Sequence, residues 1–308
     1  MQTLHFFWLL FGVFILGASF FDLYWQTRKK QKFSLRRAAF WTVVWISLAL
    51  LFNFLIYLFM GPEKALEFLT AYLLEKSLSL DNLFVFLVIF SYFNLSISFQ
   101  QKVLKWGILG AFLMRAAFIF GGIWLLQSFH FLFFVFGGFL VFSGIKLFFQ
   151  KEEKVQPEKN LFLRFVKKIA PISDDHACSS FFQKVGVKRC ITPLFVVLLL
   201  IESSDLIFAI DSVPAVLAIT GDPFIAYTSN AFAILGLRAL YFLIAGFLPR
   251  FIYLKKGVML LLVIVGLKMI LSQWWHIPIA ITLLSILFVL TFSIVLSLIK
   301  KKPHVNIQ

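Results

Sequence analysis

Long apolar runs separated by short polar segments make up most of the chain. Nine of these runs approach the ~20 residues that a helix needs to cross the hydrocarbon core of a bilayer. They lie at about 3–25, 37–60, 70–93, 103–126, 131–149, 192–219, 225–248, 257–272 and 276–299. The pattern predicts an all-α, polytopic membrane protein with about nine transmembrane helices, of which the eighth is the shortest.

The composition excludes an ordinary soluble enzyme. Of the 308 residues, 61% are hydrophobic and only 14% are charged, whereas soluble domains are nearer half apolar and a quarter charged. Two cysteines, Cys178 and Cys190, offer no disulfide framework. The first run lacks the basic start of a cleavable signal peptide, so we expect it to remain as a membrane span.

The net charge of +15 is distributed unevenly along the chain. Lys and Arg gather in every second connection between the apolar runs and at the C-terminus, whereas the alternate connections are nearly free of them. Basic loops face the cytoplasm, so the pattern predicts an outside N-terminus and a cytoplasmic C-terminus. The charge therefore indicates orientation in a lipid bilayer and gives no reason to expect a nucleic-acid partner.

The segment 150–190 is the one sizeable polar stretch between predicted spans. Part of it, LFLRFVKKIAP, fits a basic amphipathic helix on the inner membrane surface and equally well a solvated loop. The segment also offers a docking site for a cytoplasmic partner. Its Asp174, Asp175, His176 and Cys178 match no zinc-binding spacing.

Three pairs of polar residues inside the runs recur at nearly one spacing. The Asp pair is 124 positions apart, the Arg pair 123 and the Lys pair 122, namely Asp81 and Asp205, Arg115 and Arg238, and Lys146 and Lys268. This indicates a repeat of three helices, 70–149 and 192–272. Because three is odd, the second copy enters the membrane from the opposite side. Transporters built from such inverted repeats bind their substrate near the midplane between the repeats.

The repeat divides the chain into five parts. Residues 1–69 hold two accessory helices, 70–149 the first repeat, 150–190 the cytoplasmic loop, 191–272 the second repeat, and 273–308 the last helix with a basic tail.

Charged side chains near the middle of predicted spans are the main functional signal. Each costs roughly 2.5–3.5 kcal/mol to insert and is a site candidate by default. Five carboxylates face two guanidinium groups there: Glu75, Asp81, Glu202, Asp205 and Asp211 against Arg115 and Arg238. Carboxylate ligands without nearby His or Cys suit a hard divalent cation such as Mg²⁺, Ca²⁺ or Mn²⁺. The alternative is that Asp81 and Asp205 only pair with the arginines and lock the helices together.

The spacing of the carboxylates limits how they can converge. Glu202 and Asp205 share a helix face, but Asp211 lies about half a turn away on an ideal helix. Convergence therefore requires local unwinding, and Pro214 predicts an interruption of the 192–219 span. We expect support from polar neighbours and gating by the arginines, with the supporting residues being Asn82, Ser203, Ser204 and Asn230. Lys146 and Lys268 lie near helix ends, where their ammonium groups can reach the interface.

Three stretches carry a family resemblance. EKSLSLDNLFVF at 75–86, IESSDLIFAIDSVPAVLAIT at 201–220 and DPFIAYTSNAFAILGLRALYF at 222–242 resemble the TerC family of integral membrane proteins, named for tellurium resistance. The resemblance implies a bacterial inner-membrane protein related to LysE-type exporters and linked to manganese efflux. It also implies that the family's proposed metal ligands correspond to Glu75, Asp81, Glu202, Asp205 and Asp211. Manganese enters only through this resemblance.

The leading hypothesis is outward secondary transport of Mn²⁺ by a protein that is no enzyme and carries no prosthetic group. A second hypothesis is a membrane scaffold for tellurite- or stress-resistance proteins, with partners on 150–190. A third is an intramembrane aspartyl hydrolase, in which Asp81 and Asp205 share a proton.

Overall fold

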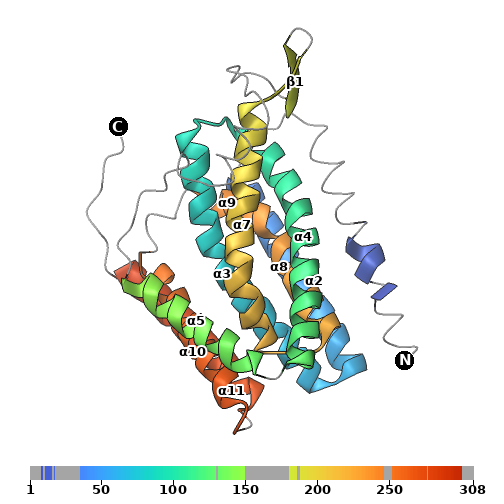
Figure 1. The fold of residues 1–308 in the computed structure, drawn as a ribbon, viewed down its shortest axis with the longest axis vertical. Helices are drawn as coiled ribbons and strands as arrows, with labels where there is room; N and C mark the ends of the chain where they lie inside the picture. Colours follow the sequence, from blue (N-terminus) through green and yellow to red (C-terminus); the bar gives the residue numbers. More distant parts are fainter. Residues whose placement is uncertain are drawn as a thin grey trace.

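Long helices account for most of the chain in the computed structural model (Figure 1). It describes residues 8–9, 11–15, 17, 35–129, 131–149, 180–185, 188–245, 252–275 and 277–299. The helices are α2 (Leu35–Met60), α3 (Pro62–Tyr92), α4 (Ile97–Ser128), α5 (Leu132–Phe149), α7 (Pro193–Leu217), α8 (Pro223–Leu235), α9 (Leu237–Ile244), α10 (Ile252–Leu271) and α11 (Ile279–Ile299). A short antiparallel hairpin, β1 (Phe182–Val185) and β2 (Lys188–Ile191), precedes α7 and is the one exception to the predicted all-α fold within these ranges.

Five of the described helices are long and apolar enough to cross a membrane, namely α2, α4, α5, α7 and α11. The pair α8 and α9 brings the number to six if it is one bent span. Helices α3 and α10 fall outside this group because every 18-residue stretch of either contains at least three charged residues. The polytopic helical architecture is therefore confirmed, whereas nine spans, the inverted repeat and the orientation stay predictions.

The helix starts follow local sequence chemistry. Pro62, Pro193 and Pro223 open α3, α7 and α8, where proline has a preset φ angle and its missing N–H costs nothing. The side chain of Thr192 accepts a hydrogen bond from the Phe195 N–H, and that of Asp222 accepts from the second and third residues of α8. These N-caps satisfy amides that have no partner within the helix.

Seven of the described helices form two groups, and α2 packs on α3 and α9. Helices α3, α4, α7 and α8 pack on one another and form the centre. Helices α5, α10 and α11 lie beside it and run obliquely in Figure 1. Glycines bring the backbones of α5 and α10 into direct contact. A Cβ atom on Gly144 would lie 2.7 Å from the Met259 carbonyl oxygen, and one on Gly266 would lie 2.7 Å from the Gly137 carbonyl oxygen.

The predicted interruption of the 192–219 span is wrong in this structure, because α7 runs unbroken through Pro214. Pro214 lies three residues before the end of the helix, so the hydrogen bond that it cannot donate is lost close to the C-terminus. Helix α3 is also unbroken across Glu75 and Asp81. The break lies instead at Gly236, where α8 and α9 meet at an angle of 42°.

The two lysines of the repeat have different surroundings. Lys146 on α5 is exposed, as expected for a side chain that reaches the interface. Lys268 on α10 is only 8% exposed, and its ammonium donates to the carbonyl oxygen of Ala218 at 3.2 Å. The expectation that Lys268 extends to the interface is therefore wrong, because a backbone acceptor at the end of α7 holds it inside.

Candidate functional site

The centre of the four-helix group contains a buried arginine with acidic partners on two other helices. Arg115 on α4 is 2% exposed and forms an ion pair with Glu75 on α3, which is fully buried. Its Nη2 atom lies 3.3 Å from Oδ1 of Asp205 on α7, and its Nη1 atom donates to the Ser212 hydroxyl at 3.1 Å. One guanidinium group thus joins α3, α4 and α7.

The two carboxylate oxygens of Asp205 have different surroundings. Oδ1 accepts hydrogen bonds from Arg115 and from the side-chain amide of Asn82, the latter at 3.0 Å. Oδ2 is buried and has no hydrogen-bond partner among the residues that the structure describes. A buried carboxylate oxygen without a partner is costly, so this atom is a candidate position for a ligand, as is Oε2 of Glu75, which is also buried without a hydrogen-bond partner among the described residues.

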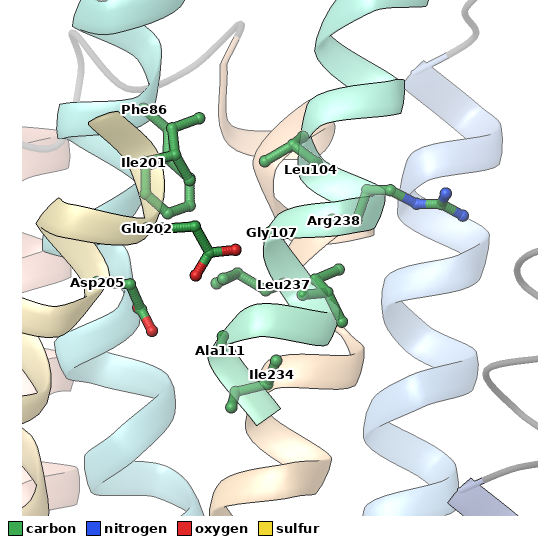
Figure 2. A pocket seen from close by; sticks show the side chains of 11 residues that line it. Phe86, Leu104, Gly107, Ala111, Ile201, Glu202, Asp205, Ile234, Leu237 and Arg238 are labelled. Carbon is green, nitrogen blue, oxygen red and sulfur yellow. The ribbon is translucent and has the colours of Figure 1, made fainter. Parts of the chain in front are cut away.

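Asp205 also lines a small pocket between α3, α4, α7 and the α8–α9 pair (Figure 2). The carboxylate of Glu202 points into the space between these helices in Figure 2 and is close enough to Asp205 for the two charges to repel. The remaining lining is apolar apart from Arg238. The volume in which the centre of a water molecule fits is about 20 Å³. The cavity is therefore large enough to hold a water.

Of two glycines on α4 that lie near Glu202, one makes room for its side chain. A Cβ atom on Gly110 would overlap the Glu202 carboxylate, whereas one on Gly107 would lie 3.8 Å from it, an ordinary contact distance. The absence of a side chain at Gly110 therefore allows Glu202 to extend toward α4.

Arg238 lines the same pocket, but its guanidinium points away from Glu202 and Asp205 in Figure 2. Of the two arginines of the repeat, Arg115 is therefore the one that contacts Asp205. Near the break between α8 and α9, the ammonium of Lys76 donates to the carbonyl oxygen of Ala233 at 3.1 Å. This hydrogen bond ties α3 to the C-terminal end of α8.

The other predicted site residues are divided between the centre and its surroundings. Asp211 interacts with the hydroxyl of Ser143 on α5, on a different side of α7 from the pocket. Ser203 and Ser204 donate to the carbonyl oxygen of Leu200 within their own helix. Asn230 on α8 is 1% exposed, and no described residue forms a hydrogen bond with either of its amide atoms.

The structure brings together Glu75, Asn82, Arg115 and Asp205, with Glu202 beside them. Asp81 lies on α3, but its side chain is outside the described part of the chain. Within the described ranges, no three His, Cys, Asp or Glu side chains are grouped so that they could hold a metal ion. The predicted convergence of five carboxylates is therefore not seen among these residues.

Sequence reasoning missed the pairing of Arg115 with Glu75 and the part played by Gly110. Gly107 and Gly110 lie three residues apart, which puts them on one face of α4. Small residues at that spacing are typical of close helix contacts in membranes. This spacing was the sequence feature that could have indicated a close approach of another helix to α4.

The comparisons with known proteins agree with this architecture. Residues 60–304 match the model of a family described as integral membrane protein TerC family. A Myxococcus xanthus membrane protein named STKORF319, of uncharacterised function, is 43% identical over 295 residues, covering 96% of this chain and 92% of that protein.

Two further relatives carry the name Alx, described as a proposed membrane-bound redox modulator. The one from Salmonella typhi is 41% identical and the one from Escherichia coli K12 is 40% identical, each over 299 residues that cover 94% of this chain and 93% of the relative. No solved structure matches the chain. The family match over most of the chain and these identities show that it belongs to the TerC family of integral membrane proteins.

Proposed function

We propose that this protein moves a hard divalent cation, Mn²⁺ in particular, outward across a bacterial inner membrane. The observation that carries the proposal is Oδ2 of Asp205, a buried carboxylate oxygen for which the described part of the chain offers no hydrogen-bond partner, in a residue that lines a pocket next to Glu202. Carboxylate oxygens are the ligands that hard divalent cations prefer. The choice of Mn²⁺ comes from the TerC resemblance of the acidic motifs.

The charges around the pocket support a divalent substrate. With their carboxylates ionised, Glu75, Glu202 and Asp205 carry three negative charges, and Arg115 supplies one positive charge. The remaining charge of −2 matches one divalent cation. In this account Arg115 is a tethered cation that pairs with Asp205 when no metal is bound and withdraws from it when Mn²⁺ arrives.

The packing of the described helices supports an inverted repeat as the transport framework. Two glycine contacts correspond under the repeat. Gly144 shifted forward by 122 residues is Gly266, and Met259 shifted back by 122 is Gly137, so the Gly144–Met259 contact in one half matches the Gly266–Gly137 contact in the other. The contacts of α4 with α7 and of α3 with α8 are exchanged in the same way. Such paired contacts are expected when two halves are related by a two-fold axis.

Transport can be tested with purified protein in liposomes that contain a manganese-sensitive dye. We expect Mn²⁺ flux from the wild-type protein and at least a tenfold loss for Asp205→Asn, which keeps the side-chain shape but removes the charge. Glu63→Gln is the matched control, because Glu63 is exposed at the start of α3. Absence of flux from the wild-type protein, or equal flux from Asp205→Asn, would sink the proposal.

The names of the Alx relatives suggest a second candidate, a redox role. In this chain it would depend on Cys178 and Cys190, of which Cys190 lies on β2. A Cys178→Ser, Cys190→Ser double variant separates the two functions, because metal flux should persist without thiols and a thiol-dependent activity should not. The scaffold role of 150–190 is tested in the same membranes, by deleting that segment and measuring Mn²⁺ flux.

A further inference from the structure

A second polar cluster lies at the opposite end of the four-helix group from the pocket. Glu67, near the start of α3, is only 7% exposed. Its carboxylate accepts hydrogen bonds from Lys64 at 2.9 and 3.1 Å and from the Thr220 hydroxyl at 2.5 Å. Thr220 belongs to the short connection between α7 and α8, so Glu67, three residues before the first predicted repeat, links the start of α3 to the middle of the second repeat.

Two more charged residues complete this cluster. Lys64 also lies 3.6 Å from the carboxylate of Asp222, the N-cap of α8. Lys268, which donates to the Ala218 carbonyl, is close enough to Glu67 for their charges to attract. We call the set Lys64, Glu67, Thr220, Asp222 and Lys268 the Glu67 network. It connects α3, α8, α10 and the end of α7.

The Lys64 ammonium is held in the network by the carboxylates of Glu67 and Asp222. Burial lowers the pKa of Lys64, but hydrogen bonding and charge attraction from Glu67, together with Asp222, outweigh it and leave the pKa above its ordinary value. The group is therefore charged at neutral pH, and its side chain, which is 33% exposed, remains partly open to water.

The network lies on one side of the proposed pathway. Glu67 precedes Glu75 by eight residues and Phe86 of the pocket by 19, which is about 12 and 28 Å along a helix. On α7 the order is reversed, with Glu202 of the pocket first, then Asp205, and then the end of the helix near Thr220. The Arg115 cluster therefore lies between the pocket and the network.

The opposite end of the repeat has no equivalent cluster in sequence. Shifting Glu67 by 122 to 124 residues leads to Arg189, Cys190 and Ile191, none of which is acidic. The counterpart of Lys268 is Lys146, which is exposed and lies 5.9 Å from the centre of the Phe142 ring. At that opposite end the Tyr241 hydroxyl donates to Oε1 of Gln100 at 3.2 Å, which is a contact between neutral groups, whereas the Glu67 network contains charged groups.

We infer that the Glu67 network is a gate that holds this end closed while the Glu202 pocket is formed at the other. By the predicted orientation the closed end faces outward. The inference rests on the proposed transport function, because a gate requires a pathway. Opening then requires the Lys64–Glu67 ion pair and the Thr220–Glu67 hydrogen bond to separate, which would release α3 from the connection between α7 and α8.

Thiol labelling tests this gate without measuring metal. Thr70, one turn after Glu67 on the same helix face, is fully buried. In a Cys178→Ser, Cys190→Ser background, Thr70→Cys should react slowly with a membrane-impermeant maleimide applied to sealed vesicles of either orientation. Adding Glu67→Gln should raise the rate at least tenfold from one side only, and Glu63→Gln should leave it unchanged.

A milder variant separates gating from unfolding. Thr220→Val removes the hydrogen bond to Glu67 and the one that the Thr220 hydroxyl accepts from the Asp222 N–H, but no charge. We therefore expect a rate between those of the parent and Glu67→Gln, with the protein still folded at the assay temperature. Equal labelling of the parent, Glu67→Gln and Thr220→Val would overturn the gate even if Mn²⁺ is transported. If these variants were labelled faster but the protein transported no Mn²⁺, the gate at this end would be upheld and manganese would be overturned as the substrate.

Discussion

The side-chain amide of Asn82 lies 3.0 Å from Oδ1 of Asp205, although 123 residues separate them in sequence. The same oxygen accepts from Arg115. Two donors from different helices therefore fix one oxygen of Asp205, and the other oxygen has no hydrogen-bond partner within the described ranges. This arrangement orients the carboxylate before any ligand arrives, and the first prediction tests that orientation.

Replacing Asn82 with alanine should weaken transport by loosening Asp205. A hydrogen bond to a charged group contributes about 1.5–3 kcal/mol, and we expect a loss of this size in the free energy of unfolding together with a higher KM for Mn²⁺. Chemical denaturation and flux assays measure the two effects. Ser98→Ala is the control, because the Ser98 hydroxyl is exposed and bonds only Ser96 among the described side chains. An unchanged KM would contradict the positioning role.

Replacing Arg115 with methionine should destabilise the protein and make its stability depend on metal. Removing one partner of a buried ion pair costs about 3–5 kcal/mol because the remaining charges are left unpaired. Here Glu75 and Asp205 would both lose their cation. Added Mn²⁺ should recover part of this loss, which is read as a larger metal-induced rise in the unfolding temperature than in the wild-type protein. No difference between the two rises would mean that metal and guanidinium do not share a position.

Replacing Gly110 with alanine should reduce transport with little effect on stability. The new methyl group would meet only the flexible end of Glu202 among its nearest neighbours, so the carboxylate moves while the helices stay in place. We expect at least a tenfold lower flux at low Mn²⁺ concentration. Gly107→Ala is the matched control, because its methyl group has room. If both variants transport equally, the position of Glu202 is unimportant.

The close contact of α5 with α10 predicts that two of its glycines cannot be replaced by alanine without loss of stability. Gly144→Ala and Gly266→Ala should each destabilise the protein by about 1–3 kcal/mol, because a methyl group placed against a backbone carbonyl forces the helices apart. A methyl group on Gly138 meets nothing within 4 Å, so Gly138→Ala should be neutral. Unfolding in detergent measures all three, and equal stability of the three variants would contradict the packing.

Hydropathy predicted the helices well, because each helix that crosses a bilayer needs about 20 apolar residues and such runs stand out in the sequence. The predicted span 37–60 corresponds to α2 and the span 276–299 to α11, with boundaries within three residues. The polar residues of the centre were also found from sequence, since a charge within an apolar run is conspicuous. Hydropathy could not tell which partner each charge would take, because that depends on how far each helix is rotated about its axis.

Two expectations about where the helices break were wrong. Pro214 was expected to break its helix and Gly236 was not, yet the structure has the reverse. A proline close to the end of a helix disturbs few hydrogen bonds, whereas a glycine in mid-span allows a bend when a neighbouring group takes over the carbonyls. The Lys76 bond to Ala233 does this, and no sequence pattern within α8 reveals a partner that comes from α3.

The direct backbone contact of α5 with α10 has a mechanical consequence. These helices belong to different predicted repeats, so a rocking movement of one whole repeat against the other would have to separate two touching backbones. A cheaper movement keeps α5 and α10 as a fixed frame and shifts the helices around Arg115, with the bend at Gly236 serving as the hinge. The molecule would then alternate by deforming each half internally, and the frame would stay still in the bilayer.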